Sequence, residues 1–256
     1  MSDLSNILEH FSSISLEEMQ SVKLMNRVDT KFIVPRALLP QILIHLTDHY
    51  YVQTNGNRRL AHYNTLYYDT SDVVMYHTHH NRKLNRQKLR ARIYCDTNEG
   101  FCEIKTKNNK GRTRKKRVEI PTDIFYDMLS DNMAHKFVQS KLWYNPDTLI
   151  PQVENHFQRI TLVNSNHSER LTIDTAIQFT NHQTGLSADL PYLVIIELKQ
   201  DGNVPSFFKN LMLDLRVKPK RISKYCLGTI LTNPSVKSNR FKRKLRYIEK
   251  NCNVIT

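Results

Sequence analysis

The chain has 256 residues, a length that suits one domain, and it carries 38 Lys and Arg against 24 Asp and Glu, a formal net charge of +14. This positive excess favours a polyanionic partner: nucleic acid, an anionic membrane or polyphosphate. No stretch approaches the roughly 18 apolar residues of a membrane span, no signal-peptide run opens the sequence, and the four cysteines form no CxxC pair, so we expect a reduced, cytoplasmic protein.

Strands and short helices alternate in the predicted N-terminal part. An apolar stripe at helical spacing follows Pro35, a residue that the first turn of a helix tolerates. The predicted order is a helix over 16–24, a strand over 26–35, a helix over 35–46, a strand over 60–70, and a short helix or turn over 71–82 that Ser71 or Asp72 caps.

Residues 88–107 are predicted to form two antiparallel strands around a polar turn at 96–100. Lys88, Arg90 and Arg92 share one face of the first strand, and the residues between them are apolar. The second strand repeats this pattern. A hairpin with one solvated face is the simplest interpretation of these residues alone.

The remaining elements continue the sheet. The tail SNRFKRKLRYIEK, with six basic residues and one acidic residue, is typical of a solvated helix face and could also dock on an acidic surface or nucleic acid. The predicted order is a strand over 111–121, helical segments over 123–140, strands over 153–164, 169–180 and 190–200, and helices over 206–215 and 223–231.

Charged residues recur at i, i+2 spacing on at least six of the predicted strands. Because the other face of each strand also needs a core, we expect an antiparallel barrel with helices outside and a charged lumen. Exposed strand faces with ion pairs are the alternative. The charged sets are Arg27, Asp29 and Lys31; Arg90 and Arg92; Glu103, Lys105 and Lys107; Lys115, Arg117 and Glu119; Arg170, Thr172 and Asp174; and Glu197 and Lys199.

A lumen of this kind is costly unless it is occupied, since burying like charges together is unfavourable. A polyanion and a divalent metal are its natural contents. The glycine-rich patterns GxxxxGK[ST] and GxGxxG are absent, so a phosphate site must be built from side chains, and Arg and Lys are suited to it.

Seven ordered motifs resemble the VTC domain, the polyphosphate polymerase domain of the vacuolar transporter chaperone complex, which has bacterial relatives without the membrane part. This family belongs to the triphosphate tunnel metalloenzymes. The resemblance implies an α+β fold, an antiparallel barrel with outer helices and a helix at one tunnel end. It divides the chain into an N-terminal helical segment (1–24), the tunnel domain (25–232) and a basic tail (233–256). The motifs are RVDTKF, LYYDT, HTHHNRKLNRQKLRARIY, EIKTKNNKGRTRKKRV, FQR with ERLTID, IIELK, and RISKY.

The resemblance also assigns roles to individual residues. It implies that ATP and a phosphate chain bind to Lys and Arg, with Mn²⁺ or Mg²⁺ on Glu197, and Glu103 is a second candidate ligand. Phe157 stands where the family has a tyrosine, and Arg221 replaces a lysine. The expected catalytic residues are Lys31, Arg90, Arg92, Lys105 and Lys224, and the expected substrate contacts are His79, Lys115, Arg117, Arg159, Arg170, Arg221 and Ser223.

The first strand bears on the reaction. Hydrolases and cyclases of this superfamily carry ExExK there, whereas this chain has Arg27-Val28-Asp29-Thr30-Lys31 and so lacks one carboxylate. We therefore expect transfer of the γ-phosphate of ATP to polyphosphate. A tripolyphosphatase or nucleoside triphosphatase, or a non-catalytic polyphosphate-binding module, is the alternative. Nucleic acid is a weaker partner, because aromatic residues do not interleave with the basic faces.

Overall fold

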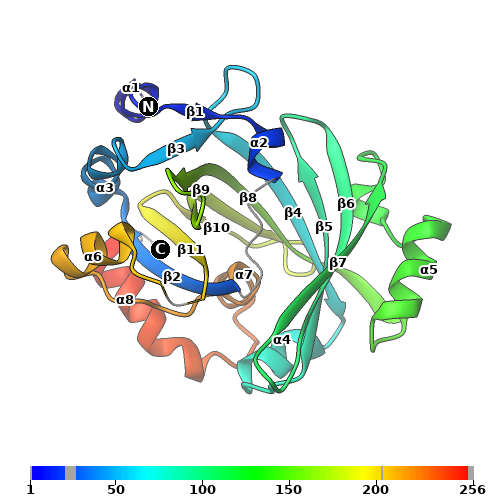
Figure 1. Ribbon diagram of the computed structural model, residues 1–256. Coiled ribbons are helices and arrows are strands. Elements are labelled where there is room, and N and C mark those ends of the chain that lie inside the picture. The colour runs from blue at the N-terminus through cyan, green and yellow to red at the C-terminus, as the bar shows by residue number, and fades with distance from the viewer. Residues whose placement is uncertain (1, 21–26, 203, 253–256) are drawn as a thin grey trace.

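A computed structural model describes residues 2–20, 27–202 and 204–252 (Figure 1). Its centre is an antiparallel sheet with the strand order β2-β11-β9-β8-β4-β5-β6-β7, curled into a half-barrel. Within the described residues β2 and β7 do not pair, so the sheet is open along this seam. The path comprises β2 (Arg27–Pro35), β4 (Ala61–Thr70), β5 (Arg86–Tyr94), β6 (Glu99–Lys107), β7 (Thr113–Ile120), β8 (Leu149–Asn164), β9 (Glu169–Asn181) and β11 (Leu193–Asp201).

Three short strands extend this sheet. β10 (Ser187–Leu190) pairs with β9, β3 (Tyr50–Gln53) pairs with β8, and β1 (Ser13–Ile14) runs parallel to β3. The sequence pattern predicts none of the three, because segments this short show no clear alternation.

The predicted alternation is confirmed by the register. Arg90 on β5 lies opposite Glu103 on β6, and Lys88 lies opposite Lys105, so their charges share the concave face. The residues between them point outward into two apolar layers. One layer joins Leu89, Ala91, Cys102 and Ile104 to the β7 end of the sheet, and the other joins Phe32, Ile160, Ile173, Ile196 and Leu198 to the β2 end.

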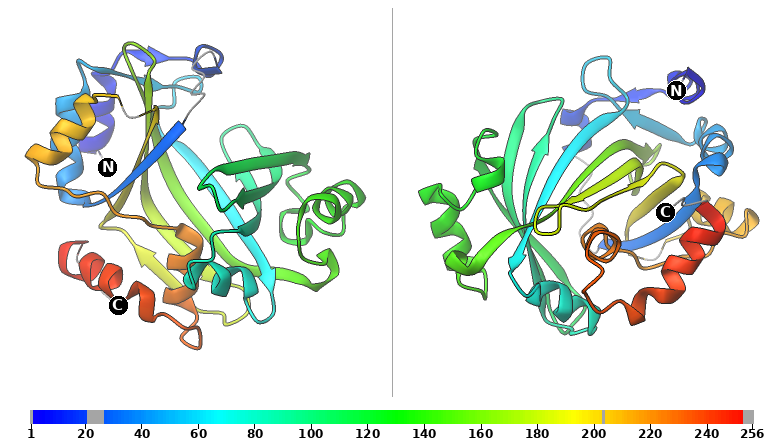
Figure 2. Two further views of the ribbon diagram at one scale, coloured as in Figure 1. Left: turned by 60° about the horizontal axis from the view of Figure 1, so that its bottom comes forward. Right: turned by 180° about the vertical axis from the view of Figure 1, so that it is seen from behind.

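Helices cover the outside of each apolar layer (Figure 2). Leu8 of α1, Leu43 of α3 and Met212 of α6 belong to the β2-side layer, whereas Phe125 of η2 and Val138 of α5 belong to the β7-side layer. None of the helices in the described ranges has the length and apolarity of a membrane span. Apart from the helices of the next paragraph, the helical segments are α1 (Ser2–Glu9), α2 (Leu16–Gln20), η1 (Arg36–Leu38), α3 (Leu39–Leu46), η2 (Phe125–Asp127), α5 (Asn132–Lys141), η3 (Pro146–Thr148) and α6 (Phe207–Asp214).

Helix α7 (Lys224–Thr232) lies within the curl of the sheet and fills one end of its interior (Figures 1 and 2). Its close approach requires Gly228, since a Cβ there would lie 2.5 Å from the Phe179 ring and 2.8 Å from a methyl group of Val153. α4 (Val74–His80) and α8 (Lys242–Cys252, after η4, Asn239–Phe241) pack around this end.

Two local predictions need correction, and two others lie partly outside the described residues. The caps Ser71 and Asp72 are wrong, because Val73 is the N-cap residue of α4 and the Asp69 carboxylate accepts the N–H groups of Met75 and Tyr76. The region 35–46 begins as a 3₁₀ turn, whereas the helical segments predicted over 123–140 are present as η2 and α5. Of the helix predicted over 16–24, the part after Gln20 lies outside the described residues, as does the first residue of the strand predicted over 26–35.

The terminal segments pack against the tunnel domain. Leu8 of α1 is buried in the β2-side layer, and Ile248 and Cys252 of α8 are buried beside α7. The basic tail is therefore solvated on one face only. The division of the chain into three segments stays a prediction.

Candidate functional site

The concave face of the sheet and α7 enclose a cavity of about 420 Å³. Twelve Lys and Arg residues line it against three carboxylates, so its wall has a large positive excess. Of the fourteen residues predicted for the site, eleven line this cavity: Lys31, His79, Arg90, Arg92, Glu103, Lys105, Lys115, Arg159, Glu197, Ser223 and Lys224.

Asp174 ties three elements together. Its Oδ1 accepts from Arg159 Nε at 2.6 Å and its Oδ2 from Arg159 Nη2 at 2.8 Å, while the Lys224 ammonium donates to Oδ2 as well. Burial alone would raise the pKa of Asp174, but these two cations hold it well below its usual range. The carboxylate is thus ionised and fully engaged, and it fixes α7 to β8 and β9.

Glu103 plays a similar part on the opposite wall. Its side chain is 1% exposed, and it accepts from Arg90 Nε at 2.7 Å and from Lys115 Nζ at 2.8 Å. Burial opposes ionisation, but Arg90, Arg92 and Lys115 lower the pKa of Glu103 below its usual range. Because both carboxylate oxygens hold cations, this arrangement does not support the predicted role of Glu103 as a metal ligand, which stays a prediction.

Glu197 is the least engaged of the three carboxylates. Its nearest cation is Lys31 on the neighbouring strand, with Nζ 3.5 Å from Oε2, and its side chain is 17% exposed. Burial alone would raise the pKa of Glu197, yet Lys199 and Lys31 hold it well below its usual range. A charged carboxylate with spare lone pairs fits Mn²⁺ or Mg²⁺, which take hard oxygen ligands and complete their shells with substrate phosphates.

Six cations of the cavity wall have no carboxylate within 4 Å among the described residues: Arg86, Lys88, Arg92, Lys105, Lys107 and Lys199. Lys88 donates to Ser223 Oγ at 2.5 Å, Lys199 to Thr172 Oγ1 at 3.2 Å, and Arg92 to Thr65 Oγ1 at 3.1 Å. Lys105 lies opposite Lys88, and Arg86 lies opposite Lys107 at one end of the same strand pair. Burial and neighbouring cations lower the pKa of Lys88, Lys105 and Lys199 to about 8. Such groups stay charged most easily when an anion binds beside them.

The comparisons with known proteins agree with this geometry. Residues 26–233 match the model of the VTC domain family. The chain belongs to the VTC domain family. A sequence comparison with curated proteins gives no match.

Solved structures show the fold of this VTC domain elsewhere. The adenylyl cyclase HpAC1 from Hippeastrum, reported to have a dominant triphosphatase activity, superposes with a TM-score of 0.50 at 14% identity, over 80% of this chain and 95% of that one. A Pyrococcus horikoshii protein gives 0.42 at 14% identity, over 78% and 97% of the two chains. The match to HpAC1 shows that the fold is that of the triphosphate tunnel proteins, as predicted.

Phe157 shows what replaces the tyrosine expected in a VTC domain. Its buried ring stacks on Tyr63 with centroids 5.1 Å apart. The Lys224 ammonium lies 3.4 Å from its centroid, and the guanidinium of Arg159 lies 5.2 Å away. Phe157 thus supports the cations through their contact with its π face rather than through a hydroxyl group.

Ser223 and His79 lie where α7 meets α4. Ser223 caps α7 by accepting from the Cys226 N–H group, and its hydroxyl also accepts from Lys88. The Cys226 thiol lies 3.1 Å from Nδ1 of His79. Burial and nearby cations lower the pKa of His79, so the imidazole is neutral. With the thiol donating to Nδ1, Nε2–H is the group of His79 that can donate to a phosphate.

Three predicted contacts do not line the cavity of this VTC domain. Arg117 lies over the Phe101 ring, 4.2 Å from its centroid, and Arg221 is exposed outside. Arg170 has a buried Nε without a partner among the described atoms, and burial together with Arg27 and Arg159 lowers its pKa. Their roles as substrate contacts stay predictions.

The predicted set omits several residues of the site, among them Asp174, Lys88, Lys199 and Asp69. Asp174, Lys88 and Lys199 line the cavity and could have been found, since each shares a parity with a predicted residue. Asp69 acts indirectly: its carboxylate accepts from α4 N–H groups and from the Tyr225 hydroxyl of α7. It therefore positions both helices that carry His79 and Ser223.

Proposed function

We propose that this VTC domain is a divalent-metal-dependent polyphosphate polymerase that transfers the γ-phosphate of ATP to a polyphosphate chain. The supporting observation is the set of six cavity cations without a carboxylate partner among the described residues: Arg86, Lys88, Arg92, Lys105, Lys107 and Lys199. Two polyanions meeting end to end repel by roughly 3 kcal/mol per pair of unit charges ~5 Å apart at an effective dielectric near 20. Unpaired cations offset this repulsion, whereas a water molecule as acceptor does not need them.

The first strand supports transfer over hydrolysis. Arg27 donates to Asp29 through Nε at 2.7 Å and through Nη2 at 3.2 Å. The only carboxylate of β2 is thereby engaged by the arginine that stands in place of the first glutamate of ExExK. A metal on this strand would lack the first carboxylate of that pattern and would have to compete with Arg27 for Asp29.

The reaction assigned to the cavity is an in-line displacement. An oxygen of the terminal chain phosphate forms a bond to the γ-phosphorus, the bond from this phosphorus to the β–γ bridging oxygen breaks, and ADP leaves. Arg90, Arg92 and Lys105 would hold the chain, and Lys224 with Ser223 would hold phosphates at α7. A Mn²⁺ or Mg²⁺ ion on Glu197 would neutralise charge on the transferred group.

Hydrolysis of tripolyphosphate or nucleoside triphosphate is the second candidate, favoured by the triphosphatase activity reported for the Hippeastrum protein of the same fold. A polyphosphate-binding module without catalysis is the third. The three differ in what becomes of the γ-phosphate.

The test is to incubate the purified protein with ATP, Mn²⁺ and short polyphosphate, and to resolve chains, ADP and orthophosphate. We expect elongation, with ADP formed in step with chain phosphate. Arg92→Ala should slow elongation by about tenfold or more, because a buried cation at the chain is lost, and should slow ATP hydrolysis less. Arg114→Ala, which removes an exposed arginine of β7, is the control. If orthophosphate accounts for all ADP and chains only shorten, the protein is a triphosphatase; binding without turnover identifies a module.

A further inference from the structure

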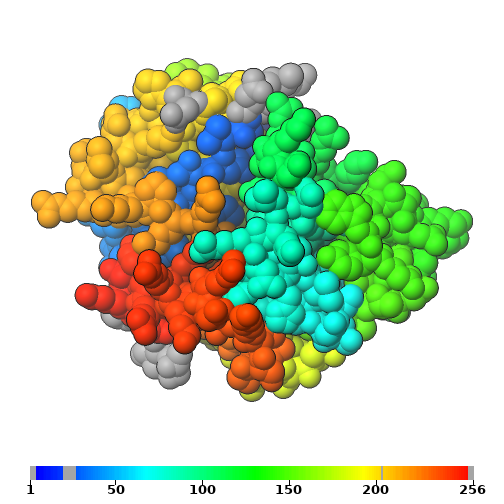
Figure 3. Space-filling view, turned by 90° about the horizontal axis from the view of Figure 1, so that it is seen from below, coloured from blue at the N-terminus to red at the C-terminus, as the bar shows by residue number. Residues whose placement is uncertain are grey.

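One end of the cavity opens beside helices α4 and α8. His79, Arg86, Lys107 and Ser223 are among the residues that line the cavity, and His79 and Ser223 belong to the α4–α7 end. Figure 3 shows a hollow in this face, bordered by β2 in blue, the start of β5 in teal and the segment before α7 in orange. The red helix α8 adjoins this rim.

Direct contacts hold the start of α8 on α4. Arg240 Nη1 donates to the Asn81 carbonyl at 3.2 Å, and the Tyr76 hydroxyl donates to the Lys237 carbonyl at 2.7 Å. The rings of Phe241 and His80 lie 5.8 Å apart. These contacts fix η4 and the residues before it, which lead into α8, beside the helix that brings His79 into the cavity.

Basic residues continue from the cavity rim onto this surface. Arg221 directly precedes Ile222 and Ser223, which line the cavity. Arg82 follows Asn81, whose carbonyl accepts from Arg240, and the Lys244 ammonium lies 4.8 Å from the centroid of the Phe241 ring. Burial lowers the pKa of Lys107 and of Lys244, and Arg221 lowers both as well, in agreement with a place between them. We name Arg82, Arg221, Arg240 and Lys244 the outer basic surface. Among the described residues, no carboxylate lies within 4 Å of any of the four.

The chemistry of α8 narrows the choice of polyanion. Its apolar residues Leu245, Ile248 and Cys252 pack against the protein, so α8 has no apolar face left to insert into a membrane. Phe241 is buried and Tyr247 is half-buried with Lys220 over its ring, so neither offers a stacking platform to nucleic acid bases. What remains is charge alone, next to a cavity whose wall is also cationic.

We propose that the outer basic surface is an exterior subsite that binds polyphosphate chains too long for the cavity. The inference rests on the proposed function, since it takes the chain in the cavity to be polyphosphate. A long chain would leave the cavity between Arg86 and Lys107, meet Arg221 and then pass along Arg82, Lys244 and Arg240. Each phosphate that these cations neutralise releases its counterions, and this release adds affinity without any contact in the cavity.

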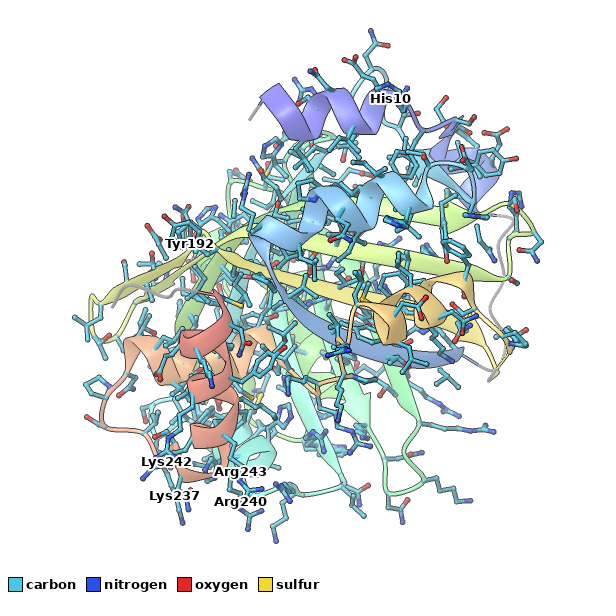
Figure 4. All side chains as sticks on the ribbon, turned by 90° about the vertical axis from the view of Figure 1, so that its left-hand side faces the viewer. His10, Tyr192, Lys237, Arg240, Lys242 and Arg243 are labelled. Atoms are coloured by element: carbon cyan, nitrogen blue, oxygen red, sulfur yellow. The ribbon has the colours of Figure 1, made fainter. Side chains whose placement is uncertain are left out.

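The test compares the affinities of tripolyphosphate and long-chain polyphosphate by calorimetry at two salt concentrations. The variant is Arg240→Glu/Lys244→Glu, and Arg240→Gln/Lys244→Gln is a milder form of it. The control is Lys237→Glu/Lys242→Glu, which changes the net charge equally. Two residues span about 200° of an α-helix, so Lys242 lies opposite Lys244, and Figure 4 shows Lys237 and Lys242 on the other side of α8 from Arg240.

We expect the wild type to bind the long chain more tightly than tripolyphosphate, with a steeper salt dependence. The charge reversal should weaken long-chain binding by about tenfold or more, the glutamine variant should weaken it less, and both should leave tripolyphosphate affinity near wild type. A fall in melting temperature that the two variants share would report the lost bond from Arg240 to the Asn81 carbonyl. The control should behave as wild type. Equal affinity of wild type for both ligands, or equal losses in variant and control, would overturn the subsite.

Two further outcomes separate this inference from its basis. If tripolyphosphate itself does not bind to the wild type, the proposed function fails. If single-stranded DNA or phosphatidylserine vesicles bind more tightly than long-chain polyphosphate and respond to the same variant, the surface serves that partner and the polyphosphate subsite is wrong.

Discussion

Two carboxylates of the cavity differ in how fully the protein engages them. Asp174 is surrounded by Arg159 and Lys224 and joins β8, β9 and α7, with its side chain 6% exposed. Glu197, two strands from β8 on β11, has one cation within 4 Å among the described residues, Lys31 at 3.5 Å. Both carry a negative charge in a cationic wall. The first is committed to holding the wall together, and the second keeps oxygens for a ligand.

This difference distinguishes a structural carboxylate, Asp174, from one that is free to take part in the chemistry, Glu197. A carboxylate whose oxygens all accept from buried cations cannot bind a metal without releasing them, and each released cation would be left uncompensated. A carboxylate with a single long contact, such as Glu197, can bind a metal without releasing a buried cation. Engagement of the oxygens, rather than proximity to the substrate, thus indicates which acid binds metal.

The largest expected effect comes from removing the engaged carboxylate. Asp174→Asn leaves Arg159 and Lys224 buried without their counterion, which costs about 3–5 kcal/mol and lowers the melting temperature by roughly 10 °C. Thermal unfolding measures it. Asp189→Asn, at an exposed position of β10, is the control. Equal melting temperatures for the two variants would show that Asp174 does not hold the wall together.

Removing the less engaged carboxylate should leave the fold intact and abolish metal-dependent chemistry. Glu197→Gln keeps the shape of the side chain, and we expect metal-dependent turnover to fall about 100-fold, or roughly 3 kcal/mol. Tripolyphosphate should still bind, while Mn²⁺ should no longer raise the melting temperature. Glu119→Gln, exposed on β7, should behave as wild type. Full turnover in Glu197→Gln would show that Glu103 or Asp174, and not Glu197, binds the metal.

The smallest expected effect is a dependence of stability on pH, to which one lysine near each of the two carboxylates contributes. Burial lowers the pKa of Lys224, near Asp174, to about 7 and that of Lys199, near Glu197, to about 8, from an ordinary 10.5. Above these values the folded protein has released protons that the unfolded chain still binds, so the stability of the free protein should rise from about pH 7 to about pH 9. Above that window, buried thiols such as Cys102, with a raised pKa, oppose the rise.

Thermal unfolding across this pH window, with and without tripolyphosphate, measures the effect. The bound anion should keep the lysines protonated and flatten the rise, and Lys199→Met should flatten part of it. A stability that falls steadily from pH 7 to pH 9 in the free protein would contradict the lowered lysine pKa values.

The lumen itself could be predicted from sequence because period-two alternation is a local property. Lys88, Arg90 and Arg92 share a face in any straight strand, and the register then brings Glu103 opposite Arg90. The pairing of Asp174 with Lys224 could not be predicted, since the two residues are 50 positions apart and meet only when α7 enters the curl of the sheet.

A bulge in β9 limits the alternation as well. Ala176 has a φ of 48°, and the register between β8 and β9 shifts at this place. Asp174 on one side of it and Ile177 and Phe179 on the other all face the interior, although their parities differ. A pattern with a strict period of two would place Asp174 opposite to Phe179, which is why the apolar contacts of α7 were not foreseen.

The open seam of the sheet bears on whether two copies of the protein associate. β7 is an edge strand, and a free edge invites pairing with the same edge of a second copy. Four consecutive basic residues occupy it, from Arg114 to Arg117, and all four are exposed. In an antiparallel union of two such edges these cations would face one another and repel, so the strand that completes the cationic wall also discourages self-association.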